Sequence, residues 1–81
     1  MPKIKYLSAA DPYSKMKVLL AGKRDVLGLT NSEVGQRVGQ THPTVKVRIS
    51  NPERMTIDEL RRYARALDIS REEIVAALPQ W

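Results

Sequence analysis

Polar and basic side chains are concentrated in residues 42–50, HPTVKVRIS, which carry hydroxyl, imidazole, ammonium and guanidinium groups. Val45 and Ile49 are four residues apart, so in a helix they share one face and leave the other face to polar groups. The outward positions of such a helix are His42, Lys46, Val47 and Ser50, with Thr44 and Arg48 at its margins. Side chains of these types contact base edges and phosphates, so the segment predicts a DNA-binding helix.

The same residue types do not form a catalytic or metal-binding arrangement. His42 is the single histidine and the chain has no cysteine, so His42 has no companion for a metal site. Most Ser, Thr, Asp and Glu residues stand at predicted helix starts, where capping accounts for them. A chain of 81 residues also leaves little room for a substantial pocket. We therefore expect no enzyme activity, cofactor, metal or small-molecule ligand.

Two short helices joined by a tight turn would position the segment. Thr30 and Glu33 have the spacing of a capping box, which predicts a helix over residues 31–38. Gly39 suits the left-handed conformation that ends a helix. Residues 42–50 then form the second helix of the pair, and the exposed backbone N–H groups at the start of the first can bind a phosphate.

Three further features shape this helix pair. Gly35 inside the first helix costs roughly 1 kcal/mol relative to alanine, which predicts a close approach by a neighbouring helix. Thr41 is expected to cap the second helix, with Pro43 in its first turn. Asn51-Pro52 ends that helix, because the residue before a proline avoids the helical region.

Other helices are expected on both sides of this pair. Asp11 should cap a helix that has Pro12 at its first position and ends at Gly28. Further capping boxes begin at Thr56 and Ser70. The apolar residues that share one face of the helix after Thr56 are Ile57, Leu60, Ala64 and Leu67. The chain therefore predicts an all-α fold with five helices and short connections.

Composition and charge agree with one small basic domain. The core must be mainly aliphatic, since the chain has no Phe, one Trp and three Tyr. Residues 1–50 hold nine Lys/Arg and three Asp/Glu, whereas residues 51–81 hold five and six. This excess beside the helix pair favours a polyanionic partner. The lack of cysteine suits a reducing cytoplasm, and the chain shows neither a secretory signal nor an apolar run of the roughly 20 residues that span a membrane.

Residues 29–70, LTNSEVGQRVGQTHPTVKVRISNPERMTIDELRRYARALDIS, resemble the helix-turn-helix of phage repressor and Cro-like transcription regulators. The similarity is closest to small phage and prophage regulators with the pattern G-x-S-x-P-T-ϕ-x-x-R-ϕ-x-N-P-x-x-ϕ-T-ϕ-x-E-L, where ϕ is apolar. The positions that meet this pattern are Gly39, Thr41, Pro43, Thr44, Val45, Arg48, Ile49, Asn51, Pro52, Met55, Thr56, Ile57, Glu59 and Leu60.

The resemblance implies a compact four- to five-helix bundle of the lambda-repressor-like type. It also implies a transcriptional regulator that binds double-stranded DNA at a pseudo-palindromic operator, in the cytoplasm of a prokaryotic cell or a phage-infected host. Members of this family often bind as dimers, and here a homodimer would use the C-terminal helix and Trp81. We expect no membrane association.

Site residues follow from the helix pair and the resemblance together. The expected base contacts are His42, Thr44, Lys46, Val47 and Arg48, and the expected DNA-backbone contacts are Asn31, Ser32, Thr41 and Ser50. Arg48 could read DNA or lie against residues 31–38. Gln40 replaces an apolar residue that is usual after the turn glycine, and we expect it to loosen the turn.

Residues 1–10 are expected to form a flexible or extended arm, whose Lys3 and Lys5 either belong to a tail or enter the minor groove. Residues 11–81 form the expected DNA-binding domain, with no separate ligand-sensing or dimerisation domain. Trp81 either docks on its own domain or covers a hydrophobic patch of a partner subunit.

Two other functions are compatible with this sequence. The same fold could serve as a protein-interaction module, such as an adaptor, antitoxin or inhibitor, because fold does not fix function. The acidic final segment and the apolar Val47 favour this alternative. A non-specific architectural DNA binder is the second alternative, and it would bind all duplexes with similar affinity.

Overall fold

Five α-helices and one 3₁₀ turn make up the described part of the chain, residues 11–79, which holds no strand. In the computed structural model these elements are α2 (Ser14–Val26), α3 (Asn31–Val38), α4 (His42–Ser50), η1 (Pro52–Arg54), α5 (Ile57–Ala66) and α6 (Arg71–Ala77). The expected all-α class is therefore confirmed. The predicted arm of residues 1–10 and Trp81 lie outside the described residues. No helix between residues 11 and 79 is long and apolar enough to cross a membrane.

Local capping chemistry starts three of the helices as predicted. The side chains of Thr30, Thr56 and Ser70 accept hydrogen bonds from the backbone N–H three residues later. In each case the glutamate at that later position accepts a hydrogen bond from the N–H of the capping residue. Each box satisfies two backbone donors that would otherwise lack an intrahelical partner. Gly39, at φ 77°, ends α3 in the predicted left-handed conformation.

The start of α2 differs from the prediction. Asp11 Oδ1 accepts a hydrogen bond from the Tyr13 N–H at 2.9 Å, as a capping carboxylate would. Its other oxygen pairs with Lys17 Nζ at 2.7 Å. Pro12 and Tyr13 form a turn, however, and regular helix begins only at Ser14. Asp11 therefore caps this turn two residues ahead of α2 rather than the helix itself.

The core also differs from the predicted pattern at two positions of α5. Tyr63 is fully buried, at 0 % exposure, although the sequence favoured an aliphatic core. The spacing predicts Ile57 on the inner face, but Ile57 is 77 % exposed. It is the first residue of α5, and the residues of α5 that contact the core, such as Leu60 and Tyr63, lie further along the helix. The buried hydrophobic residues are Met16, Leu20, Val34, Val38, Val45, Ile49, Tyr63, Leu67, Ile69 and Ala77.

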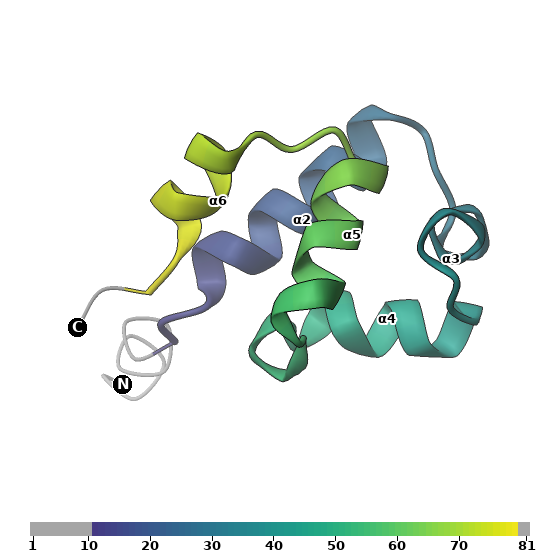
Figure 1. The fold of residues 1–81 in the computed structure, drawn as a ribbon, viewed down its shortest axis with the longest axis horizontal. Helices are drawn as coiled ribbons and strands as arrows, with labels where there is room; N and C mark the ends of the chain where they lie inside the picture. The colour runs from purple at the N-terminus through teal and green to yellow at the C-terminus, as the bar shows by residue number, and fades with distance from the viewer. Residues whose placement is uncertain (1–10, 80–81) are drawn as a thin grey trace, which may run out of the picture.

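The helices place α4 and α6 on different parts of the molecule. α3 contacts both α4 and α5, whereas α6 contacts α2 toward the opposite end (Figure 1). α4 runs along one edge, beyond the chain reversal at Gly39 and Gln40. This arrangement leaves the outer side of α4 uncovered by the other described helices.

Candidate nucleic-acid interface

The two faces of α4 divide as the sequence predicts. Val45 is fully buried and Ile49 is only 6 % exposed, so these two side chains anchor the helix to the core. The residues exposed on the other side are His42, Pro43, Lys46, Val47 and Ser50, while Thr44 and Arg48 are partly buried at the margins. α4 therefore presents an outward row in which His42, Lys46 and Ser50 are polar or basic and Pro43 and Val47 are apolar.

The turn before α4 is tight because Gly35 has no side chain. A Cβ atom at this position would collide with the backbone carbonyl oxygen of Gln40 and would lie 3.4 Å from a methyl group of Val45. The Gly35 carbonyl also accepts hydrogen bonds from the N–H groups of Gly39 and Gln40. The predicted close approach at Gly35 is thus present, but it involves the turn backbone as well as α4.

Thr41 occupies the cap position of α4 without capping it. Its hydroxyl oxygen lies 3.0 Å from that of Thr44, and it accepts no hydrogen bond from a backbone N–H group. The predicted side-chain cap is therefore wrong. Both hydroxyl groups lie at the start of α4, where backbone N–H groups have no partner within the helix.

The predicted backbone contacts on α3 have different surroundings. Ser32 is exposed, whereas Asn31 is partly buried and its Oδ1 accepts a hydrogen bond from Arg24 Nη1 at 2.9 Å. The amide NH₂ group of Asn31 takes no part in this bond and can still donate to a phosphate. Both residues lie in the first turn of α3, beside the capping box of Thr30.

A hydrogen-bonded network fixes α4 against α5 and settles the position of Arg48. Arg48 Nε donates to Glu59 Oε2 at 3.0 Å, and Gln40 Nε2 donates to the same oxygen at 2.6 Å. The buried Tyr63 hydroxyl donates to Gln40 Oε1 at 2.6 Å. Arg48 thus pairs with Glu59 of α5, a partner that neither of the two expectations for Arg48 included. The expectation for Gln40 is wrong, because Gln40 ties the turn to α5 rather than loosening it.

The protonation of this network matches its geometry. The backbone hydrogen bond from Thr56, followed by the bond from Arg48, lowers the pKa of Glu59 to about 2. Burial, with a further contribution from the Glu59 charge, raises the pKa of Tyr63 to about 12. At neutral pH the carboxylate is therefore charged and the Tyr63 phenol keeps the proton that it donates. The sequence showed Glu59 only as a capping residue, so it did not reveal the role of the second carboxylate oxygen.

Charge on the outward row is not neutralised by nearby carboxylates. Within residues 11–79, His42 and Lys46 form no ion pair.

Among the same residues no group of three or more His, Asp or Glu side chains could hold a metal ion. No protein family, curated protein or solved structure matches this chain.

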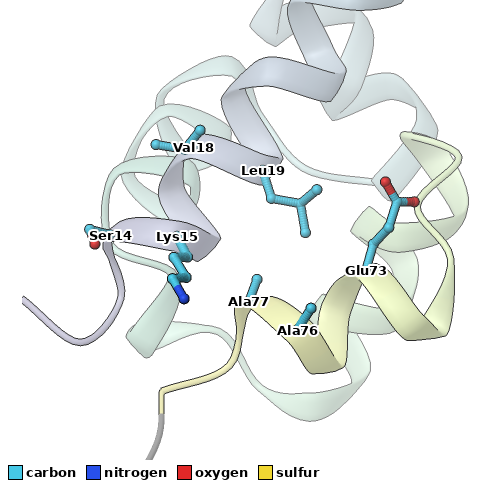
Figure 2. Close-up of a pocket in the computed structure, with 7 residues that line it drawn as sticks. All are labelled: Ser14, Lys15, Val18, Leu19, Glu73, Ala76 and Ala77. Carbon is cyan, nitrogen blue, oxygen red and sulfur yellow. The ribbon is translucent and has the colours of Figure 1, made fainter.

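A separate groove lies between α2 and α6. Figure 2 shows Leu19 of α2 pointing toward Ala76 and Ala77 of α6 across it, and Val18 also belongs to its lining. Its volume is about 460 Å³, and α4 contributes no residue to its lining. Glu73 at its edge pairs with Lys23 at 2.9 Å and caps α6, so capping and ion pairing account for this carboxylate.

Proposed function

We propose that this chain is a sequence-specific double-stranded DNA-binding protein in which α3 and α4 form a helix-turn-helix of the lambda-repressor-like type. One observation carries the proposal. α4 is anchored by Val45 and Ile49. On its other side it presents an exposed row that includes His42 and Lys46, neither of which forms an ion pair within residues 11–79. The major groove, about 12 Å wide, admits one helix with its side chains directed at base edges.

Each residue of the row has a defined part in the proposed complex. His42 and Lys46 donate hydrogen bonds to base edges, Thr44 contributes a hydroxyl group, and Val47 packs against a thymine methyl group. The groups proposed to hold phosphates are those of Asn31, Ser32, Thr41 and Ser50. Arg48 holds α4 on Glu59 through Nε and is a positioning residue first. Only its terminal nitrogens remain for a base contact.

The regulatory part of the proposal follows from the resemblance. A protein on its operator would block or recruit polymerase, as expected of a phage or prophage regulator in a prokaryotic cytoplasm. The groove of Figure 2 and the 72 % exposed Val18 support a homodimer in which a second copy covers the α2–α6 surface. Two copies would then read half-sites about one helical turn apart.

Selection of bound duplexes from a random pool tests the proposal. Enrichment of one short sequence is the expected result, and an inverted repeat within that sequence would support the homodimer. Equal binding of all duplexes would instead identify an architectural DNA binder. A pull-down from cell lysate, with and without nuclease, tests the other alternative. If no duplex is retained in the selection and nuclease leaves the set of captured proteins unchanged, the chain is a protein-interaction module.

A further inference from the structure

A second groove, between α5 and α6, combines an apolar floor with an arginine rim. The apolar residues that line it, here called the floor, are Ile57, Leu60 and Ala64 of α5 and Ile74 of α6, and the three arginines that line it are called the rim. Its volume is about 280 Å³. Ile57 is 77 % exposed although it is a large aliphatic residue, so its apolar surface is available to a partner. Arg61, Arg65 and Arg71 line the same groove.

The rim has a positive charge that the chain itself barely compensates. Arg61 has one distant partner, Asp58 at 3.5 Å, and its side chain remains 70 % exposed. Arg65 and Arg71 are exposed and form no ion pair within residues 11–79. No carboxylate lines the groove.

We propose that this groove binds an acidic amphipathic peptide segment of a partner protein. Guanidinium groups recognise carboxylates through paired hydrogen bonds, and an apolar floor accepts the i, i+3 and i+4 side chains of a helix. The volume lies just below the roughly 300–1,000 Å³ of small-molecule pockets, so a shallow peptide contact fits better than an enclosed ligand. A DNA backbone could pair with the arginines, but it would leave Ile57 and Ile74 without an apolar partner.

The groove is separate from the other surfaces of the protein. None of the outward residues of α4 lines it, and the α2–α6 groove uses different residues of α6. α6 also lies away from α4 along the molecule (Figure 1). A partner in the α5–α6 groove could therefore be held while α4 is occupied, and the inference does not depend on DNA binding.

The test uses a labelled helical peptide of about 14 residues, with leucines at i, i+3, i+4 and i+7 flanked by glutamates, titrated into the full chain without DNA. One control peptide carries lysines in place of the glutamates, and a second carries serines in place of the leucines. We expect fluorescence anisotropy to show binding of the acidic amphipathic peptide alone. The absence of binding by this peptide up to about 1 mM would overturn the proposal, as would equal binding of either control.

Matched variants locate the contact. The double variant Arg61→Gln/Arg71→Gln removes two rim charges and should weaken peptide binding about fivefold or more. The control variant Lys15→Gln/Arg54→Gln removes two exposed cations that lie outside the groove and form no ion pair within residues 11–79, and it should change peptide affinity less than about twofold. If both double variants lost the same amount of peptide affinity, only the net charge of the protein would matter, and the proposal would be wrong.

A second pair tests the apolar floor. Ile57→Ser should weaken peptide binding about fivefold to tenfold, because it removes the exposed aliphatic surface that the leucines cover. Val26→Ser changes an equally exposed residue, at 83 %, on α2 outside the groove, and should have no effect. If the arginine double variant impairs duplex binding while the peptide is unaffected, the rim is a DNA-phosphate surface and the proposal fails.

Discussion

Glu59 has three roles in one side chain. One carboxylate oxygen closes the capping box at Thr56, and the other accepts hydrogen bonds from Arg48 and Gln40. Its side chain is only 12 % exposed, so these bonds are poorly screened by water. A single carboxylate thus starts α5, holds the turn before α4 and orients Arg48. The outward row depends on this support although Glu59 does not belong to it.

Lys46 should contribute to the recognition of a specific base in the DNA duplex. Lys46→Ala is expected to weaken binding to the selected duplex by about 1–3 kcal/mol and to relax the preference at one base position. Arg54→Ala is the control, since Arg54 is an exposed cation of η1 that lies outside the outward row and lines neither groove. Titrations of both variants against the selected duplex and single-base variants provide the measurement. Unchanged affinity and preference in Lys46→Ala would remove Lys46 from the reading residues.

Glu59 should make stability depend on acid pH. Its pKa of about 2 in the folded chain lies below the ordinary value of 4.5, so the ionised carboxylate favours folding above about pH 4.5. This contribution is lost as the pH falls from about 4.5 toward 2. Glu59→Gln should lower the unfolding free energy at pH 7 by about 1–3 kcal/mol, and the difference from wild type should shrink across that window.

Urea unfolding of both proteins at pH 7, 4 and 2.5 checks this prediction. The pKa values of Asp11 and Glu73 are also lowered, by their bonds to Lys17 and to the Ser70 N–H respectively. Both residues are present in the two proteins, so their effects cancel in the comparison. A difference that stays constant with pH would contradict the ion pair with Arg48.

At the scale of elements, α3, the turn and α4 act as one unit. The left-handed Gly39 reverses the chain, and Gln40 then links the turn to Tyr63 and Glu59 of α5. Gly35 lets the Gln40 carbonyl come close to α3. The direction of α4 therefore depends on backbone contacts in the turn as well as on the buried Val45.

Replacing each of the two helical glycines, Gly35 and Gly22, by alanine should change the stability of the fold in opposite directions. Gly35→Ala forces the Gln40 backbone to move and should destabilise the fold by about 1–3 kcal/mol, despite the better helix propensity of alanine. Gly22→Ala has open space around the new methyl group and should stabilise α2 by about 0.5–1 kcal/mol. Thermal unfolding of both variants is the measurement, and a stabilised Gly35→Ala would show that the turn is not tightly packed.

At the scale of the whole molecule, separate surfaces surround one small core. The outward row lies on α4, the Figure 2 groove lies between α2 and α6, and the arginine-rimmed groove lies between α5 and α6. Within residues 11–79, a core of ten buried hydrophobic residues supports all three surfaces. The proposed DNA contact and the proposed partner contact can therefore be varied independently by exposed substitutions.

Salt should weaken DNA binding steeply. Each phosphate neutralised by the protein releases counterions, so the slope of log K against log salt is about −0.9 per phosphate contact. Titrations of the selected duplex from about 50 to 200 mM salt should give a clearly negative slope. The affinity of the acidic peptide for the α5–α6 groove should fall less than duplex affinity over the same salt range, because the peptide also makes apolar contacts. A flat response for the duplex would contradict phosphate contact.

Much of the helical framework could be predicted because its signals are local. The three capping boxes, the Gly39 stop and the Val45–Ile49 spacing involve residues no more than four apart. Hydrogen bonds and side-chain directions within one helical turn depend on little beyond that turn. The sequence by itself therefore determined the bounds of α3 and α4 and the outward row of α4.

The network and the grooves could only be decided by tertiary structure. Gln40 and Tyr63 are 23 residues apart, and Arg48 and Glu59 are 11 apart, so no local pattern brings them together. Helical spacing put Ile57 on the inner face, but the packing of α5 left it exposed and buried Tyr63. Which side of a helix meets the core, and which charges meet one another, depends on how separate helices cross, and periodicity along one helix does not contain that information.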